Sequence, residues 1–229
     1  MQIQNNIDRI QASIRTTAER CGRNPDDIQL IGVSKRKPAG LIRDAIAAGH
    51  KNFGENYIQE AMEKIDELGR DAACWHFIGH LQSNKAKFAV KYFDLIHTVD
   101  KLKLAKEINK QAAKIGKVQQ VLLQINIAQE DTKSGAAAGE VLDLARSISQ
   151  FDHLSLQGLM CMPPFFDDPE EARPYFRAVR IIKDEIAGMN LPGVEMNHLS
   201  MGMSNDYAVA IEEGATLVRV GTAIFGRRD

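Results

Sequence analysis

Lys35 has a sequence context in which a lysine could act as a nucleophile. It follows the apolar segment 27–33, which predicts a buried strand, and Pro38 fits the first position of a helix because its missing N–H would have no partner there. Partial desolvation at the end of such a strand lowers the pKa of the ammonium group. A neutral amine can attack an aldehyde and hold it as a Schiff base. This stretch alone is also compatible with an ordinary surface lysine.

Two loops near the C-terminal end of the chain suit a phosphate group. They supply glycines and hydroxyl side chains: Ser200, Gly202, Ser204, Gly221 and Thr222. Glycine lets the backbone approach a ligand closely, and nearby helix N-termini offer free N–H groups. For Ser204 the alternative is a helix cap, with Asp206 favourable in the first turn. A phosphate cradle beside a Schiff-base lysine suits a phosphorylated aldehyde, of which pyridoxal phosphate (PLP) is the common one.

Other polar residues are weaker candidates. His76 and His80 are separated on a strand by about 13 Å, at roughly 3.3 Å per residue, so they cannot bind one metal ion and we expect no metal site. His80 is better placed as a loop residue near the pocket. The remaining candidates have ordinary interpretations, as turn or surface histidines, a solvated or paired carboxylate, and a lysine facing solvent or another charge: His50, His97, His153, Glu55 and Lys37.

The elements that would position these residues follow a simple alternation. Isoleucines at positions 3, 7, 10 and 14 predict an amphipathic helix over residues 1–22. After it, helical patterns alternate with eight predicted strands: 27–33, 52–54, 74–79, 94–99, 118–127, 154–162, 194–199 and 215–220. This pattern predicts an α/β protein with one (β/α)8 barrel domain spanning residues 1–229, with its chemistry at the carboxyl ends of the strands. An open doubly wound sheet is the rival, but no glycine-rich nucleotide motif follows any strand.

Composition narrows the class of protein further. The 29 basic and 30 acidic residues nearly cancel and form no long like-charge run, which argues against general binding to nucleic acid or an anionic membrane. The N-terminal residues do not have the pattern of a signal peptide, and no apolar run approaches the roughly 20 residues that span a bilayer. Three widely spaced cysteines indicate reduced thiols. We therefore expect a cytoplasmic protein, and a monomer, because few apolar residues should be exposed.

Several blocks of the chain closely resemble one known family. They stand in order at 33–38, 53–57, 75–85, 133–135, 158–160, 199–206 and 218–226. Across essentially the whole chain, they are similar to the pyridoxal phosphate homeostasis proteins of the YggS/PROSC type. The resemblance implies a barrel like the N-terminal domain of alanine racemase, with PLP as its cofactor.

The resemblance also implies roles for individual residues. Lys35 would carry PLP as a Schiff base, and Arg219 would face the pyridine nitrogen. The phosphate would be held by residues of the two C-terminal loops: Ser200, Gly202, Gly221 and Thr222. Asn56 and His80 would lie near the ring. Arg36 stands where the family commonly has a small residue such as threonine, and we expect it to change only the mouth of the pocket.

Arg219 favours a carrier over an enzyme. A charged arginine favours an unprotonated pyridine, which stabilises a carbanion weakly. Related racemases add a tyrosine base from a second domain, which we do not expect here, and the four tyrosines of this chain are assigned to helices or their starts. We therefore expect a protein that stores PLP and supplies or buffers it, with PLP-dependent apoenzymes as recipients and no significant turnover. The alternatives are a single-domain amino-acid racemase that uses Lys35 as a base, or a barrel that binds another phosphorylated metabolite without a covalent bond.

Overall fold

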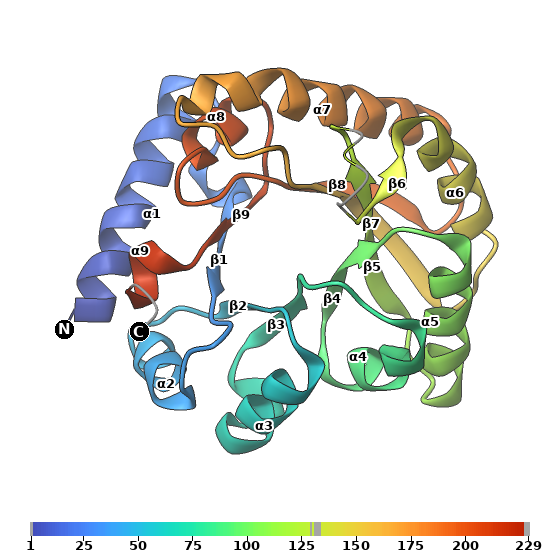
Figure 1. The fold of residues 1–229 in the computed structure, drawn as a ribbon, viewed down its shortest axis with the longest axis horizontal. Coiled ribbons are helices and arrows are strands. Elements are labelled where there is room, and N and C mark those ends of the chain that lie inside the picture. Colours follow the sequence, from blue (N-terminus) through green and yellow to red (C-terminus); the bar gives the residue numbers. More distant parts are fainter. Residues whose placement is uncertain (1, 129, 131–133, 227–229) are drawn as a thin grey trace.

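The computed structural model describes residues 2–128, 130 and 134–226 of the chain. Its centre is a closed barrel of eight parallel strands, with helices arranged around it (Figure 1). In order around the barrel the strands are β1 (Gln29–Val33), β2 (Asn52–Glu55), β3 (Cys74–Phe77), β4 (Leu95–Val99), β5 (Gln119–Asn126), β7 (Leu154–Cys161), β8 (Val194–Ser200) and β9 (Leu217–Val220). Pairings of β4 with β5 and of β9 with β1 close the ring. The predicted (β/α)8 fold is confirmed.

The helices cover the outer surface of the barrel. They are α1 (Gln2–Arg20), α2 (Ala39–Ala47), α3 (Ile58–Leu68), α4 (Ala86–Tyr92), α5 (Leu102–Lys114), α6 (Val141–Ile148), α7 (Arg173–Gly188), α8 (Tyr207–Glu212) and α9 (Thr222–Phe225). The predicted N-terminal helix is α1, which packs against α2, α8 and α9 rather than following a strand of the barrel (Figure 1). None of the described helices is both long enough and apolar enough to cross a membrane.

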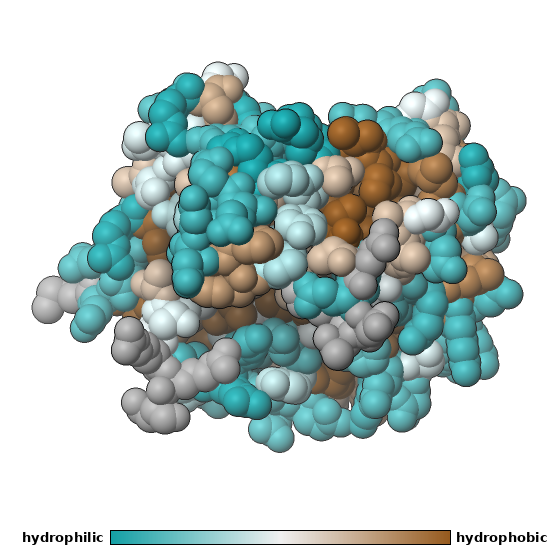
Figure 2. Space-filling view, turned by 45° about the horizontal axis from the view of Figure 1, so that its top comes forward, coloured by the Kyte–Doolittle hydropathy of each residue, from teal (hydrophilic) through white to brown (hydrophobic). Residues whose placement is uncertain are grey.

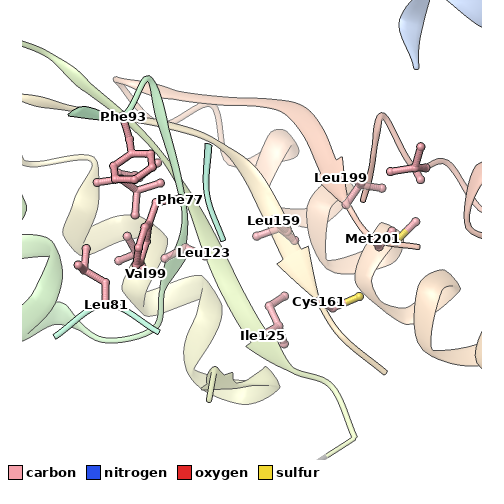
Figure 3. Packing of buried hydrophobic residues seen from close by; sticks show 14 of the residues in the cluster. Phe77, Leu81, Phe93, Val99, Leu123, Ile125, Leu159, Cys161, Leu199 and Met201 are labelled. Atoms are coloured by element: carbon pink, nitrogen blue, oxygen red, sulfur yellow. The ribbon is translucent and has the colours of Figure 1, made fainter. Parts of the chain in front are cut away.

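Alternation along the strands separates two apolar layers. Side chains of one parity face the helices, as Leu123 and Ile125 on β5 and Leu159 and Cys161 on β7 show in Figure 3. Side chains of the other parity face the barrel interior, where one small apolar cluster lies: Ile31, Leu95, Leu122, Met160 and Leu217. Successive residues of a strand point to opposite faces of the sheet. A residue that follows a member of this inner cluster by two positions on the same strand therefore also points into the barrel.

Several element boundaries differ from the sequence-based expectation. A two-residue strand, β6 (Ala136–Ala137), pairs with β5 beside the barrel. The helix expected from Ser204 begins at Tyr207, because residues 203–206 form a turn held by the Asp206 side chain. The face seen in Figure 2 is mostly hydrophilic, and its most extended apolar area lies right of the upper centre. Among the described residues, the exposed large hydrophobic side chains are Tyr57, Ile115, Val118, Met162, Phe165 and Ile181.

Candidate functional site

Lys35 lies in a tight turn at the carboxyl end of β1. The Lys37 N–H donates a hydrogen bond to the Ser34 carbonyl oxygen at 3.1 Å, which closes a turn over residues 34–37. Arg36 occupies the third position with a φ of 58°, in the left-handed region that favours glycine. The Arg36 guanidinium lies over the Tyr57 ring, 5.6 Å from its centroid. The turn directs Lys35 to the barrel mouth while Arg36 packs on the rim.

A buried ionic network fixes this turn from below. The Ser34 hydroxyl donates to Glu55 Oε1 at 2.7 Å, and Lys64 Nζ donates to Glu55 Oε1 at 2.7 Å and to the Ser34 carbonyl oxygen at 2.8 Å. Glu60 also accepts from Lys64, and from the Arg36 N–H. Glu55 is fully buried, and burial raises its pKa above the ordinary value although Lys64 acts in the opposite direction. Glu55 is thus a paired carboxylate, while Lys64 and Glu60 hold the backbone on the two sides of Lys35; we name Ser34, Glu55, Glu60 and Lys64 the ionic clamp.

A cavity of about 200 Å³ opens beside Lys35 at the carboxyl ends of the strands. Its lining includes three cationic side chains, from Lys35, Lys37 and Arg219, and no carboxylate. The other lining residues are Val33, Asn56, Ile78, Met162, Met203, Ser204, Gly221, Thr222 and Gly226. Lys37 therefore lies at the cavity together with Lys35. A larger hollow, about 680 Å³, lies beside α1 at the opposite ends of β1 and β2, away from the strand ends where barrels place their chemistry.

Only some residues of the two C-terminal loops line this cavity. Ser204, Gly221 and Thr222 line it. Ser204 does not cap α8; instead Asp206 Oδ1 accepts from the Met203 N–H at 2.6 Å and holds the turn before the helix. The cavity is therefore bordered by the hydroxyls of Ser204 and Thr222.

Ser200 and Gly202 lie behind the cavity rather than on its wall. The Ser200 hydroxyl is fully buried and hydrogen-bonded to Arg219 and His97. Gly202 has a φ of 89°, and a Cβ there would lie 2.6 Å from Ala210 Cβ, so only glycine lets the loop pack this closely on α8. Ser200 therefore holds the Arg219 side chain, and Gly202 lets the loop pack against α8.

Asn56 and His80 lie at the other side of the mouth. Asn56 lines the cavity, and its Oδ1 atom is buried without a partner among the described residues. A Cβ on Gly79 would lie 2.1 Å from the Asn56 carbonyl oxygen, so glycine is required for the two loops to meet. His80 is exposed and lines a neighbouring hollow that shares Asn56, with its Nδ1 atom 3.2 Å from Ser134 Oγ. Lys133, which precedes Ser134 in the sequence, lies outside the described residues.

Arg219 is the buried cation of the site. Its guanidinium donates to Ser200 Oγ at 2.6 Å and to the Cys161 carbonyl oxygen at 2.9 Å. No carboxylate of the described residues lies within 4.0 Å of it. Burial lowers its pKa from the ordinary value, yet an arginine side chain stays charged at neutral pH. The positive charge of Arg219 is therefore held at the cavity by neutral acceptors.

Two histidines inside the barrel were not expected to be part of the site. His97 Nδ1 lies 2.9 Å from Ser200 Oγ, and His97 Nε2 lies 3.0 Å from His76 Nδ1. The expectation that His97 is a turn or surface residue is wrong, whereas His50 does lie in the turn after α2, buried and with Nε2 2.8 Å from the Asn52 carbonyl oxygen. Burial lowers the pKa of His76 to about 4 and that of His97 well below its ordinary value. The alternation of strand residues carried the missed signal, since His97 shares the parity of the inward-facing Leu95.

Comparisons with known proteins agree with this architecture. A family model described as the N-terminal domain of alanine racemase matches residues 5–229. The chain is 42% identical to the pyridoxal phosphate homeostasis protein of Vibrio alginolyticus and 43% identical to that of Escherichia coli K12, covering 99% of this chain and 98% and 97% of theirs. It belongs to the alanine racemase N-terminal domain family and, within it, to the pyridoxal phosphate homeostasis proteins.

Solved structures show the same fold. PipY of Synechococcus elongatus, in a structure with PLP bound, matches with a TM-score of 0.85 and 37% identity over 98% of this chain and all of that chain. Alanine racemase from Corynebacterium glutamicum matches with a TM-score of 0.73 at 17% identity, over 96% of this chain and 62% of the racemase chain. At that identity the racemase supports the fold alone.

Proposed function

We propose that this protein binds PLP through Lys35 and stores or supplies it without significant turnover. The observation that carries the proposal is the cavity in which Lys35, Arg219 and the hydroxyls of Ser204 and Thr222 meet. The relatives named above as pyridoxal phosphate homeostasis proteins, and PipY with PLP bound, support it.

The donor set of the cavity fits PLP chemically. A phosphate dianion suits hydroxyl and cationic donors, and the described lining has both without a carboxylate to repel it. The buried, unpartnered Asn56 Oδ1 is an acceptor available for a ligand donor. We assign the phosphate to the loops that contain Ser200, Gly202, Ser204, Gly221 and Thr222. Ser200 and Gly202 contribute indirectly, through Arg219 and through loop packing.

The protein's own residues divide the work of binding. Lys35 Nζ supplies the amine that condenses with the aldehyde to a Schiff base, with loss of one water. The ionic clamp holds the Lys35 backbone; with PLP bound, Arg219 would face the ring nitrogen, and Asn56 and His80 would lie near the ring. When bound, PLP supplies an electrophilic carbon and an electron-withdrawing ring.

Two features of the site favour low turnover: the arginine at position 219, and a cavity lining without a tyrosine that could act as a base. An arginine at the ring nitrogen favours the unprotonated pyridine, which is a weak electron sink. All four tyrosines are described, and none lines the cavity: three donate or accept elsewhere through their hydroxyls and Tyr175 stacks on Phe166. A general acid or base contributes about 10²–10⁴-fold, so its absence would leave little racemisation.

An absorbance spectrum followed by borohydride reduction and peptide mapping tests the covalent site. We expect a Schiff-base band that changes on reduction, with the added mass on Lys35. Lys35→Ala should abolish the trapped adduct, whereas Lys37→Ala, which removes the neighbouring lysine of the same cavity, should leave it in place. An adduct that maps to another lysine in the wild type would overturn the assignment. Tight PLP binding with no reducible bond would favour a non-covalent metabolite site.

Turnover is tested separately from binding. The loaded wild type should racemise amino acids no faster than free PLP at the same concentration. It should restore activity to a PLP-dependent apoenzyme when the two are mixed. Racemisation well above the free cofactor that disappears in Lys35→Ala would instead establish the racemase alternative.

A further inference from the structure

A continuous chain of hydrogen bonds crosses the barrel beneath the proposed cofactor site. Arg219 on β9 donates to Ser200 on β8, and Ser200 bonds to His97 on β4, across the interior. His97 bonds to His76 on the adjacent β3, and His76 Nε2 lies 3.4 Å from Cys74 Sγ at the start of the same strand. We name Ser200, His97, His76 and Cys74 the histidine relay.

The Arg219 end of the relay fixes the direction of its hydrogen bonds. At one end the Arg219 guanidinium can only donate. At the other end burial, together with the nearby Asp94 carboxylate, raises the pKa of the Cys74 thiol to about 12, so the sulfur that lies against His76 Nε2 keeps its hydrogen. The carboxylate is held in turn by Arg70 and by the Trp75 N–H.

The buried Ser200 hydroxyl fixes the arrangement of hydrogens. Its hydrogen-bond partners among the described residues are Arg219, which cannot accept, and His97 Nδ1, so its hydrogen goes to His97, and each neutral imidazole has one N–H and one acceptor nitrogen. Ser200 accepts from Arg219 and donates to His97 Nδ1; His97 Nε2–H donates to His76 Nδ1; and His76 Nε2–H donates to Cys74 Sγ. Every bond then carries one hydrogen, and both imidazoles are neutral with the hydrogen on Nε2.

We infer that His97 and His76 are positioning residues, which orient the Ser200 hydroxyl so that its oxygen accepts from Arg219 and the guanidinium is fixed facing the cavity. The inference deepens the proposed function, because the group that Arg219 faces there is the ring nitrogen of PLP. Without an acceptor on His97, the Ser200 hydroxyl hydrogen would have no fixed direction and could turn toward Arg219, which cannot accept it. The acceptor on His97 removes that freedom.

The relay also explains how the Arg219 charge can remain buried without a directly bonded carboxylate, since the buried Asp206 carboxylate acts on it only from beyond ion-pair distance. A carboxylate beside Arg219 would neutralise its field at the cavity, whereas a chain of aligned neutral dipoles stabilises the guanidinium and leaves its net charge intact. The nearest acceptors, Ser200 Oγ and the Cys161 carbonyl oxygen, are both neutral. The guanidinium charge at the cavity is thus not cancelled by a directly bonded carboxylate.

Nitrogen-15 NMR of the PLP-free protein tests the direction of the relay without any cofactor. We expect His97 and His76 to be neutral near pH 7, each with a hydrogen on Nε2 and none on Nδ1. A hydrogen on His97 Nδ1, or a charged imidazole in either residue, would overturn the inference. This readout does not depend on whether PLP binds.

Substitutions at His97 test its effect on Arg219. His97→Asn keeps an acceptor near the Nδ1 position, whereas His97→Leu removes it. With PLP loaded, His97→Leu should shift the absorbance maximum and weaken PLP binding by up to about tenfold, the effect of losing one hydrogen bond between neutral groups. His97→Asn should restore most of both, and His153→Gln, which changes a histidine outside the relay, should match the wild type. Equal spectra and affinities in His97→Leu and wild type would overturn the inference.

Failure of the inference and of the proposed function can be told apart. If the wild type takes up no PLP on Lys35, the function fails whatever the tautomers are. If the wild type loads normally but the tautomers or the His97 variants behave otherwise than stated, only the relay fails. Should His97→Leu not fold, Ser200→Ala, a smaller change, provides the same spectral comparison.

Discussion

Two polar networks lie below the two key residues of the mouth, and they solve the problem of buried polarity differently. The ionic clamp beneath Lys35 is built from charges, with the fully buried Glu55 paired to Lys64 on the helix-facing side of β2. The histidine relay beneath Arg219 is built from neutral groups inside the barrel. The clamp holds a backbone turn, and the net charge of the clamp does not affect that role. The relay supports Arg219, whose positive charge acts on the ligand.

The two networks are also opposite in their dependence on pH. Burial raises the pKa of Glu55 but lowers the pKa values of His76 and His97. For Glu55 the folded protein holds the proton more tightly than the unfolded chain, so its contribution to stability falls as pH rises above the ordinary carboxyl range. For the histidines the unfolded chain holds the proton more tightly, so stability falls as pH drops below 6.5.

The largest expected effect comes from breaking the ionic clamp. Lys64→Met leaves Glu55 buried without its cation, which should lower the free energy of unfolding by about 3–5 kcal/mol near pH 8. The loss should be smaller at pH 5, where Glu55 can take up a proton. Urea unfolding of the PLP-free protein measures both values, and Lys103→Met, at an exposed lysine of α5, is the matched control. A loss below 1 kcal/mol at both pH values would mean that the clamp does not hold the fold.

Acid should weaken the protein through the relay. The pKa of His76 is about 4 in the folded protein against an ordinary 6.5, and this difference corresponds to about 3 kcal/mol of stability lost between pH 6.5 and 4. His76→Gln should therefore flatten the stability profile over that interval. His80→Gln, at an exposed histidine, should leave the slope as in the wild type. An unchanged slope in His76→Gln would contradict the neutral buried state.

Ser200→Ala should cost less than breaking the clamp. It leaves an Arg219 N–H and His97 Nδ1 without their partner, an effect of about 1–3 kcal/mol on the free energy of unfolding. Ser149→Ala removes a hydroxyl whose hydrogen bond is exposed to water and should change stability little. If Ser200→Ala destabilised the protein more than Lys64→Met, the ranking of the two networks would be reversed.

The smallest effect concerns the turn that the clamp supports. Arg36→Ala and Arg36→Gly both remove the contact with Tyr57, but only alanine keeps a Cβ at a φ of 58°. Arg36→Gly should therefore be the more stable of the two by up to about 1 kcal/mol, since glycine accepts this φ without penalty. Thermal unfolding of the two variants side by side measures the difference. Greater stability of the alanine variant would mean that the turn changes conformation when Arg36 is removed.

The elements of the barrel were largely predictable from local patterns. The alternation of apolar segments and helical periodicity located all eight barrel strands, because each strand and helix must bury one face against the same core. The positions of Lys35 and Arg219 at strand ends were likewise readable, since parallel strands place their carboxyl ends at one edge. The start of α8 was misjudged because Asp206, rather than Ser204, holds the preceding turn.

The partners of the buried polar groups were not predictable in the same way. Ser200 carries a hydroxyl suited to phosphate, yet it lies below the cavity and contacts Arg219. Glu55 and Lys64 are nine residues apart and meet only because α3 packs back over β2. His97 and Ser200 are separated by more than a hundred residues and meet across the interior. Such contacts depend on the curvature and register of the closed barrel, which no local pattern encodes.

The sequence by itself determined the periodicities of the strands and helices, the cation at the end of β1 and the near-neutral net charge, because these follow from the order of residue types. Only the tertiary structure decided which polar groups are buried together, and hence which charges are paired and which imidazoles are neutral. The physical reason is that desolvation and hydrogen bonding are set by neighbours in space. Closing the barrel brings the side chains of His97 on β4 and Ser200 on β8 within hydrogen-bond distance. This places a neutral relay behind Arg219.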